Sequence, residues 1–135
     1  MTIINDSIIL LITVLHILVV IFVIIAPFSD SNYLLVMHII LIPFIVLHWI
    51  LNNNTCSLTL AEKYVREISY GIKSDDKDCF VYQFIAPIYD FNKDHETYSN
   101  FIYLVTFILW SISVYNLNSK IMRGKIESFQ DLTRL

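Results

Sequence analysis

Three histidines lie inside long apolar stretches of this chain: His16, His38 and His48. An ionisable side chain at membrane depth is costly unless it is paired, so each is a candidate functional residue. His38 and His48 are ten residues apart, about 15 Å along a helix and roughly 80° apart around it, so they cannot share a metal ion. His16 and His48 fall on opposite arms of a predicted helical hairpin, at levels that differ by about 6 Å. These two residues could therefore hold a haem between them.

The alternative role for the three histidines is structural. A neutral imidazole inside a helix bundle can hydrogen-bond to a backbone carbonyl, or to a Ser or Thr hydroxyl of a neighbouring helix. This interpretation needs no cofactor, and we favour it over a haem, a metal site or a proton path.

A second group of polar side chains follows the second apolar stretch: Cys56, Thr59, Glu62 and Arg66. Cys56 and Glu62, together with His48, could bind a metal ion or act as nucleophile, acid and base. No second pair of ligands follows at a suitable spacing, and Thr59 with Glu62 also matches a helix capping box. In this interpretation Arg66 pairs with Glu62 or with a lipid phosphate. We therefore assign these residues a structural or lipid-facing role, name no catalytic residue and favour a protein that is not an enzyme.

The elements that position these residues are predicted to be membrane-spanning helices. Of the 135 residues, 56% are hydrophobic, and three apolar stretches cover about residues 8–28, 33–51 and 98–117. About 20 helical residues cross the roughly 30 Å hydrocarbon core of a bilayer. We predict an all-α integral membrane protein with a single membrane domain over 1–135. No basic cluster suggests a nucleic-acid partner.

The first two spans are predicted to form a hairpin, because Pro27 stops the first helix and turn-forming residues follow it. Pro43 lies inside the second span, where it removes one backbone hydrogen bond and should kink the helix. The carbonyl that it frees needs another donor in lipid, so we expect this face to pack against protein. The first span lacks the charge pattern of a cleaved signal peptide, and we expect it to stay as an anchor.

An amphipathic helix is predicted over about 59–71, between the second and third spans. Leu60, Tyr64 and Ile68 recur every four residues on its apolar stripe, and Gly71 is a plausible end. Such a helix is expected to lie along the membrane surface with this stripe toward the lipid.

The segment over about 80–91 is aromatic, too short to span and interrupted by Pro87, so we expect an interfacial or re-entrant piece. Cys56 and Cys79 could form a disulfide in an oxidising compartment or remain free thiols. The basic residues near the span ends are balanced, three against three, with a slight preference for a cytoplasmic C-terminal tail.

The order of these motifs resembles a known family. His16 and His38 in the first two spans are followed by Cys56-Ser57-Leu58-Thr59, then by Glu62 and Arg66. With the later aromatic block, this order resembles the bacterial domain-of-unknown-function family 2784, over roughly Leu11 to Asn116. The chain differs at Ser57 and Asp90, where the family pattern has proline. The resemblance implies a compact small membrane protein and brings no known activity, and the composition is typical of AT-rich genomes such as those of giant viruses and protists.

We therefore expect a structural or assembly role, as a subunit of a larger membrane complex or of a viral membrane. The expected partners are the lipid bilayer and other membrane subunits, or further copies of this chain. The alternative is a redox or ligand-binding protein whose intramembrane histidines hold haem or a metal. A small transporter or channel is less favoured, because few polar residues repeat along one face of the third span.

Overall fold

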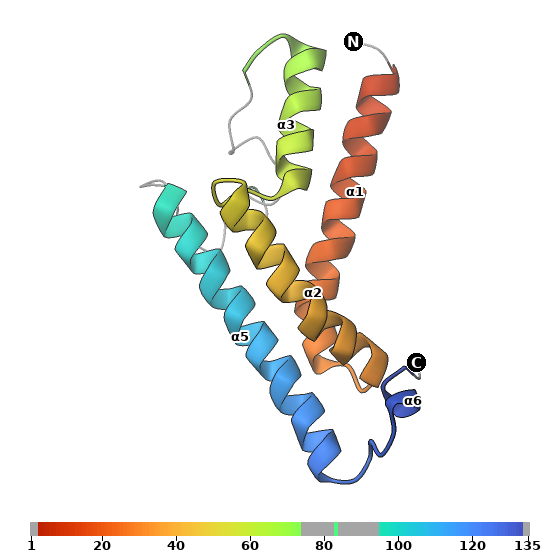
Figure 1. Ribbon diagram of the computed structural model, residues 1–135. Coiled ribbons are helices and arrows are strands. Elements are labelled where there is room, and N and C mark those ends of the chain that lie inside the picture. Colours follow the sequence, from red (N-terminus) through yellow and green to blue (C-terminus); the bar gives the residue numbers. More distant parts are fainter. Residues whose placement is uncertain (1–2, 74–82, 84–94, 134–135) are drawn as a thin grey trace. The chain divides into compact units, whose positions relative to one another are not determined.

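The fold is all helical in the part of the chain that the structure describes, which is residues 3–73, 83 and 95–133 of a computed structural model (Figure 1). No strand occurs among these residues, so the predicted all-α fold is confirmed. The helices are α1 (Ile3–Ile25), a 3₁₀ turn (Ala26–Phe28), α2 (Asn32–Leu51), α3 (Ser57–Tyr70), α5 (His95–Met122) and α6 (Phe129–Leu132).

Three of the described helices are long and apolar enough to cross a membrane, as predicted. They cover Ile3–Phe28, Asn32–Leu51 and Ser99–Met122, with 26, 20 and 24 residues. The first span begins earlier than predicted and the third ends later, because helix continues into the polar residues that flank each apolar stretch. The predicted interfacial segment at 80–91, apart from residue 83, and Cys79 lie outside the described residues.

The chain forms two compact units, each built from two separate stretches. Unit 1 joins Met1–Val19 to His48–Tyr98, and unit 2 joins Val20–Leu47 to Ser99–Leu135. The prediction of a single membrane domain stays a prediction.

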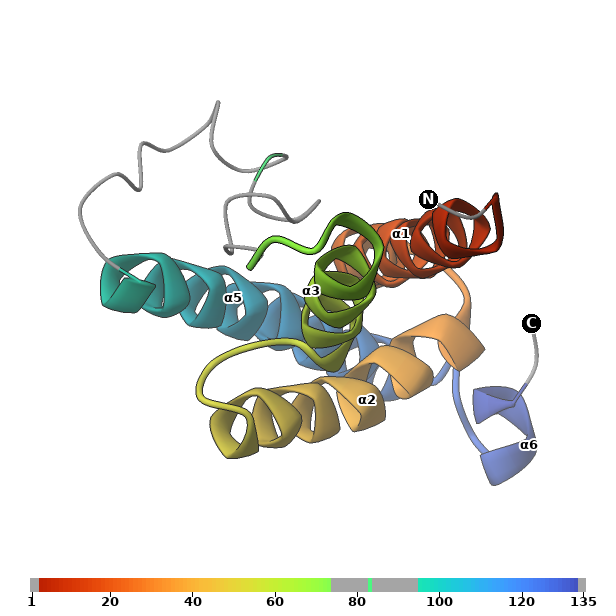
Figure 2. The same cartoon turned by 90° about the horizontal axis from the view of Figure 1, so that it is seen from above.

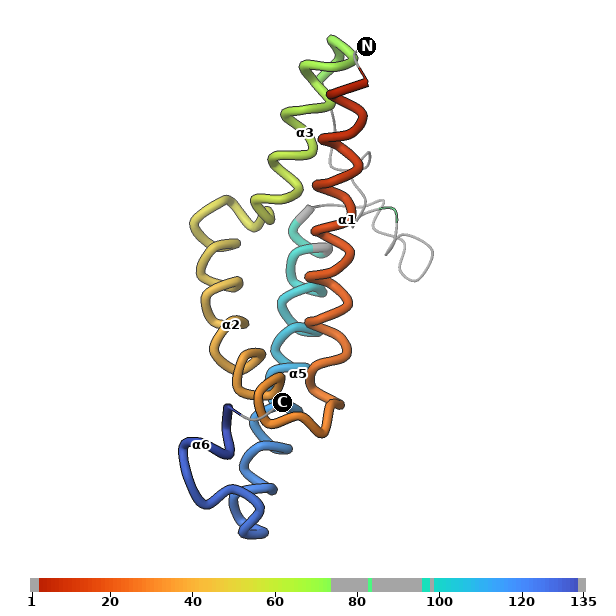
Figure 3. The backbone as a smooth tube through the Cα atoms, turned by 90° about the vertical axis from the view of Figure 1, so that its right-hand side faces the viewer, coloured from red at the N-terminus to blue at the C-terminus, as the bar shows by residue number. Residues whose placement is uncertain are grey.

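In unit 1, α3 lies alongside the N-terminal half of α1 (Figures 1, 2 and 3). Gly71 ends α3 in the left-handed conformation, with φ of 66°, and its N–H donates to the Glu67 carbonyl at 2.9 Å. The predicted amphipathic helix and its glycine stop are therefore confirmed. Its placement along a membrane surface stays a prediction.

The predicted start of this helix at Thr59 was wrong. Helix α3 begins at Ser57 and Cys56 is its N-cap residue, so Thr59 lies within the first turn. The Glu62 carboxylate accepts hydrogen bonds from Arg66 instead of reaching back to a cap amide. The physical reason is that another side chain, His48, accepts the hydrogen bond of the Ser57 amide at the start of the helix.

In unit 2, α2 and α5 run side by side, and side chains of α5 bond to α2 (Figure 1). The buried residues of α2 are spaced for one helix face: Leu35, His38 and Ile42. Those of α5 are small and polar, and follow every seven residues: Ser99, Thr106 and Ser113. Small side chains let helix backbones approach closely in a membrane, which suits this interface.

The turn between α1 and α2 is held by residues of the C-terminal third of the chain. Asn116 Nδ2 donates to the carbonyl oxygen of Pro27 at 2.7 Å. Lys120 Nζ donates to the Asp30 carbonyl oxygen and, at 3.0 Å, to Asn32 Oδ1. These bonds satisfy backbone and side-chain groups that the tight turn leaves outside its own helices.

Candidate functional site

His38 is a fully buried residue of α2 that bonds to both of its neighbouring helices in unit 2. Its exposed fraction is 0%, and Nε2 lies 3.1 Å from the carbonyl oxygen of Val23 on α1. Because a carbonyl can only accept, Nε2 carries the ring proton and Nδ1 has the lone pair. Ser113 Oγ of α5, at 2.8 Å, therefore donates to Nδ1. One imidazole thus joins three helices.

The carbonyl that accepts from His38, that of Val23, lies four residues before Pro27. In a continuing helix the Val23 carbonyl would accept from the backbone nitrogen four residues on, which belongs to Pro27 and has no hydrogen. His38 supplies the missing N–H. The favoured sequence hypothesis, an imidazole bonded to a carbonyl and to a Ser hydroxyl, describes the geometry of this residue.

Pro43 repeats this relationship in the middle of α2. The carbonyl four residues before it, that of Ile39, loses its intrahelical donor. Trp110 of α5 donates its indole Nε1–H to this oxygen at 3.1 Å. The expectation that the freed carbonyl packs against protein is confirmed.

His48 lies at the C-terminal end of α2 and accepts a hydrogen bond from the start of α3, the helix that follows. Its Nε2 accepts a hydrogen bond of 3.0 Å from the backbone N–H of Ser57, the first residue of α3. The ring proton of the neutral imidazole is then on Nδ1. Asn52 Nδ2 donates to the His48 carbonyl oxygen at 2.8 Å. His48 thus satisfies one of the amides that a helix N-terminus leaves without an intrahelical partner.

The haem predicted between His16 and His48 would need a ring lone pair from each of these histidines. In this structure the lone pair of His38 accepts from Ser113, and that of His48 accepts from Ser57. Iron bound to either residue would have to displace that donor. Among the described residues, no group of three or more His, Cys, Asp and Glu side chains is placed to hold a metal ion. The haem alternative stays a prediction.

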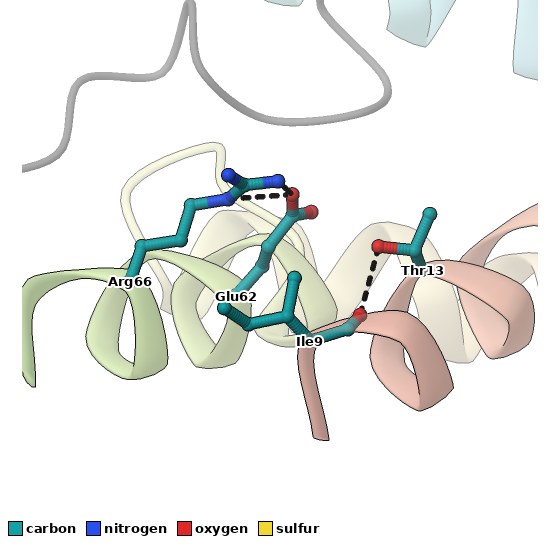
Figure 4. Close-up of polar contacts among 4 residues, drawn as sticks. All are labelled: Ile9, Thr13, Glu62 and Arg66. Carbon is teal, nitrogen blue, oxygen red and sulfur yellow. Dashed lines mark hydrogen bonds and ion pairs between the residues drawn. The ribbon is translucent and has the colours of Figure 1, made fainter. Parts of the chain in front are cut away.

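The remaining predicted residues lie in unit 1, where Glu62 is a buried carboxylate. Glu62 has an exposed fraction of 0%, and its Oε1 accepts from Arg66 Nε at 3.1 Å and from Arg66 Nη2 at 2.8 Å (Figure 4). His16 of α1 is also buried, in the same unit. Cys56 is half-buried at the start of α3. The structure therefore pairs Glu62 with Arg66 in this unit and His48 with the start of α3, and it places the buried His16 in the same unit.

Sequence reasoning missed the partners on α5. Ser113, Trp110 and Asn116 were not predicted as partners of the α1–α2 hairpin, because they looked like isolated polar or aromatic residues in an apolar span. The seven-residue spacing of Ser99, Thr106 and Ser113 was a usable signal, since it places small polar groups on one helix face.

Comparisons of this chain with family models, with curated proteins and with solved structures give no match. The resemblance to the domain-of-unknown-function family 2784 stays a prediction from the sequence motifs.

Proposed function

We propose that this chain is a small integral membrane protein with a structural or assembly role, as a subunit of a larger membrane complex in a cellular or viral membrane. The observation that supports this proposal is that polar side chains in unit 2 form hydrogen bonds between its helices. His38, Ser113 and Trp110 are each bonded within the bundle, to groups of a neighbouring helix. Their hydrogen bonds hold the helices together, so none of these three groups is available to bind a substrate.

The outward side chains of the spans in unit 2 support the same role. Large apolar residues of α2 and α5 are more than half exposed: Ile40, Phe44, Leu47, Leu104 and Phe107. These residues contact either acyl chains or the helices of another protein in a membrane. Because lipid tails are as apolar as leucine, only close packing and interhelical polar bonds favour a protein partner.

An apolar groove on unit 2 offers such packing. It has a volume of about 330 Å³ and is lined by Ile42, Pro43, Val46, Tyr103, Phe107 and Trp110. Pro43 of α2 is one of the residues that line this groove. Side chains of a neighbouring subunit can pack into this groove and gain the van der Waals contacts that hold membrane helices together.

The experiment that tests a subunit role is the mass of the particle extracted from its native membrane in a mild detergent. The protein mass is measured by light scattering with the detergent contribution subtracted, and co-extracted proteins are identified after crosslinking. We expect a particle heavier than the 15.8 kDa chain, with the same composition in repeated extractions. A particle of one chain, with no crosslinked protein, would contradict the proposal.

A visible absorption spectrum of the same sample separates this role from the haem alternative. A Soret band that disappears when His16 or His48 is replaced would overturn the structural proposal. A sample that is heavier than one chain and has no such band supports it.

A further inference from the structure

Helix α3 has the reverse of the side-chain distribution that is expected of a helix in water. Its apolar stripe is exposed, with Tyr64 at 66% and Ile68 at 61%, whereas Glu62 is 0% exposed. A helix that turns its apolar side chains outward suits surroundings of acyl chains, because these contacts remove the apolar surface from water. The outer surface of α3 is therefore suited to contact with lipid.

The direction of α3 in unit 1 gives the level of its side chains along α1. The C-terminal end of α3 and the N-terminus of α1 lie at the same end of this unit (Figures 1 and 3). Figure 4 shows Glu62 beside Ile9, which lies near the N-terminal end of the first candidate span, Ile3–Phe28. Each further turn of α3, to Arg66 and then to Tyr70, leads toward that end. In a membrane that α1 crosses, Arg66 and Tyr70 therefore lie at the level of the lipid headgroups.

The Arg66 guanidinium is held by Glu62 on one side and is open on the other. Its Nε and Nη2 donate to Glu62 Oε1 at 3.1 and 2.8 Å. In Figure 4 no bond is drawn to the third nitrogen, Nη1, which points away from the carboxylate, and 28% of the side chain is exposed. A guanidinium has five N–H donors, and a donor without an acceptor is costly beside lipid. The remaining donors of Arg66 therefore need an acceptor from outside the described part of the chain.

Two further residues of α3 lie on the same flank of the helix as Arg66. Lys63 precedes it by three residues and Tyr70 follows it by four, which is the spacing of one helix face. Tyr70 is 48% exposed, and a phenol hydroxyl can donate a hydrogen bond. Lys63 adds a second positive charge to the flank. The acids of α3 are Glu62, which bonds to Arg66, and Glu67, which has an interaction of its own.

We propose that Arg66 and Tyr70, with the charge of Lys63, bind the phosphodiester of a phospholipid at the headgroup level of unit 1. The planar guanidinium presents paired N–H donors to phosphate oxygens, and its bonds to Glu62 fix its orientation. The acyl chains of the same lipid extend along the exposed apolar stripe of α3. This site rests on the membrane location in the proposed function and does not depend on the subunit role.

The test is solid-state NMR of the full chain in phospholipid vesicles and phosphate-free buffer, with ¹³C at the arginine Cζ atoms. Dephasing of a Cζ signal by lipid ³¹P reports a guanidinium in contact with a phosphate. Arg66→Lys identifies the Arg66 signal, and if that variant does not fold, Arg123→Lys and Arg134→Lys identify the other two. We expect dephasing at Arg66 that is reduced in Tyr70→Phe. Tyr64→Phe, the same substitution on the apolar stripe, is the matched control and should leave the dephasing unchanged.

Three results would overturn the proposal. The first is the absence of dephasing at Arg66 in vesicles that contain the folded chain. The second is equal dephasing in Tyr70→Phe and Tyr64→Phe, which would remove the Tyr70 hydroxyl from the site. The third is dephasing that appears only after inorganic phosphate is added, which would assign the site to free phosphate and not to a lipid. The subunit role survives each of these results, because the mass of the extracted particle tests it separately.

Discussion

The indole Nε1–H of Trp110 donates a hydrogen bond of 3.1 Å to the carbonyl oxygen of Ile39, which lies four residues before Pro43. A proline inside a membrane helix removes one backbone N–H donor, and the carbonyl that it leaves without a partner cannot bond to water in the lipid. Helix α5 supplies the donor from a side chain. His38 does the same for Val23, which lies four residues before Pro27. A side chain of a neighbouring helix thus donates to the carbonyl four residues before each of these two prolines, and each bond joins two helices.

Trp110→Phe should destabilise the fold mainly through the Ile39 carbonyl. The substitution keeps an aromatic ring and much of its packing, but the N–H is lost and a buried acceptor is left unpaired. We expect a loss of about 1–2 kcal/mol in the free energy of unfolding, within the range for unsatisfied groups and for interhelical bonds in membranes. Titration of the folded protein in mixed micelles with a denaturing detergent measures this quantity.

The matched control for this prediction is a double-mutant cycle with Pro43→Ala. Alanine in place of the proline restores a backbone N–H, so the Ile39 carbonyl has a donor even when Trp110 is replaced. Trp110→Phe should therefore cost less in the Pro43→Ala background than in the unsubstituted chain. An equal cost in both backgrounds would show that the indole N–H does not compensate for the proline.

Ser113→Ala should weaken the bond between α5 and the buried imidazole of His38. The substitution removes the donor at Nδ1 and leaves a buried ring nitrogen unsatisfied, for which we expect a loss of about 1 kcal/mol. Ser111→Ala is the matched control, because the Ser111 hydroxyl bonds to the Phe107 carbonyl of its own helix. Similar unfolding free energies for the two variants would contradict a structural role for the His38–Ser113 bond.

The spans could be predicted from the sequence because the length and apolar composition of a segment decide whether it can cross a membrane. The need for a donor near Pro43 could also be predicted, because a proline affects only the carbonyl four residues before it in the same helix. The sequence did not reveal the donor, since Trp110 lies 71 residues away from Ile39. The start of α3 was misplaced for a similar reason. A Thr-x-x-Glu pattern suggests a cap at Thr59, but the His48 imidazole reaches the Ser57 amide from the preceding helix. Glu62 was predicted to cap the helix and to pair with Arg66, and only the structure shows that its side chain is fully buried.

Gly71→Ala should destabilise the end of α3 through backbone strain. Gly71 has φ of +66°, and a Cβ placed there would meet no atom within 4 Å, so the cost is conformational and not steric contact with neighbours. We expect a loss of about 1 kcal/mol for alanine in the left-handed region. Gly71→Asn should cost less, because asparagine tolerates this region better. Unfolding free energies that are equal for the two variants would count against this account of the helix end.

His48→Phe should loosen the first turn of α3 without unfolding the spans. The substitution keeps an aromatic ring at the end of α2 but removes the acceptor for the Ser57 amide, which lies 3.0 Å from Nε2. Amide hydrogen exchange followed by NMR should therefore become faster at Ser57.

The Leu60 amide, which donates to the Cys56 carbonyl at 3.0 Å, serves as the internal reference within the same helix. If His48 caps α3, exchange at Ser57 accelerates more than exchange at Leu60, because the loss of a cap affects the first amides directly. Equal acceleration at both amides would mean that α3 as a whole is loosened, and unchanged exchange at Ser57 would mean that another group can accept its hydrogen bond.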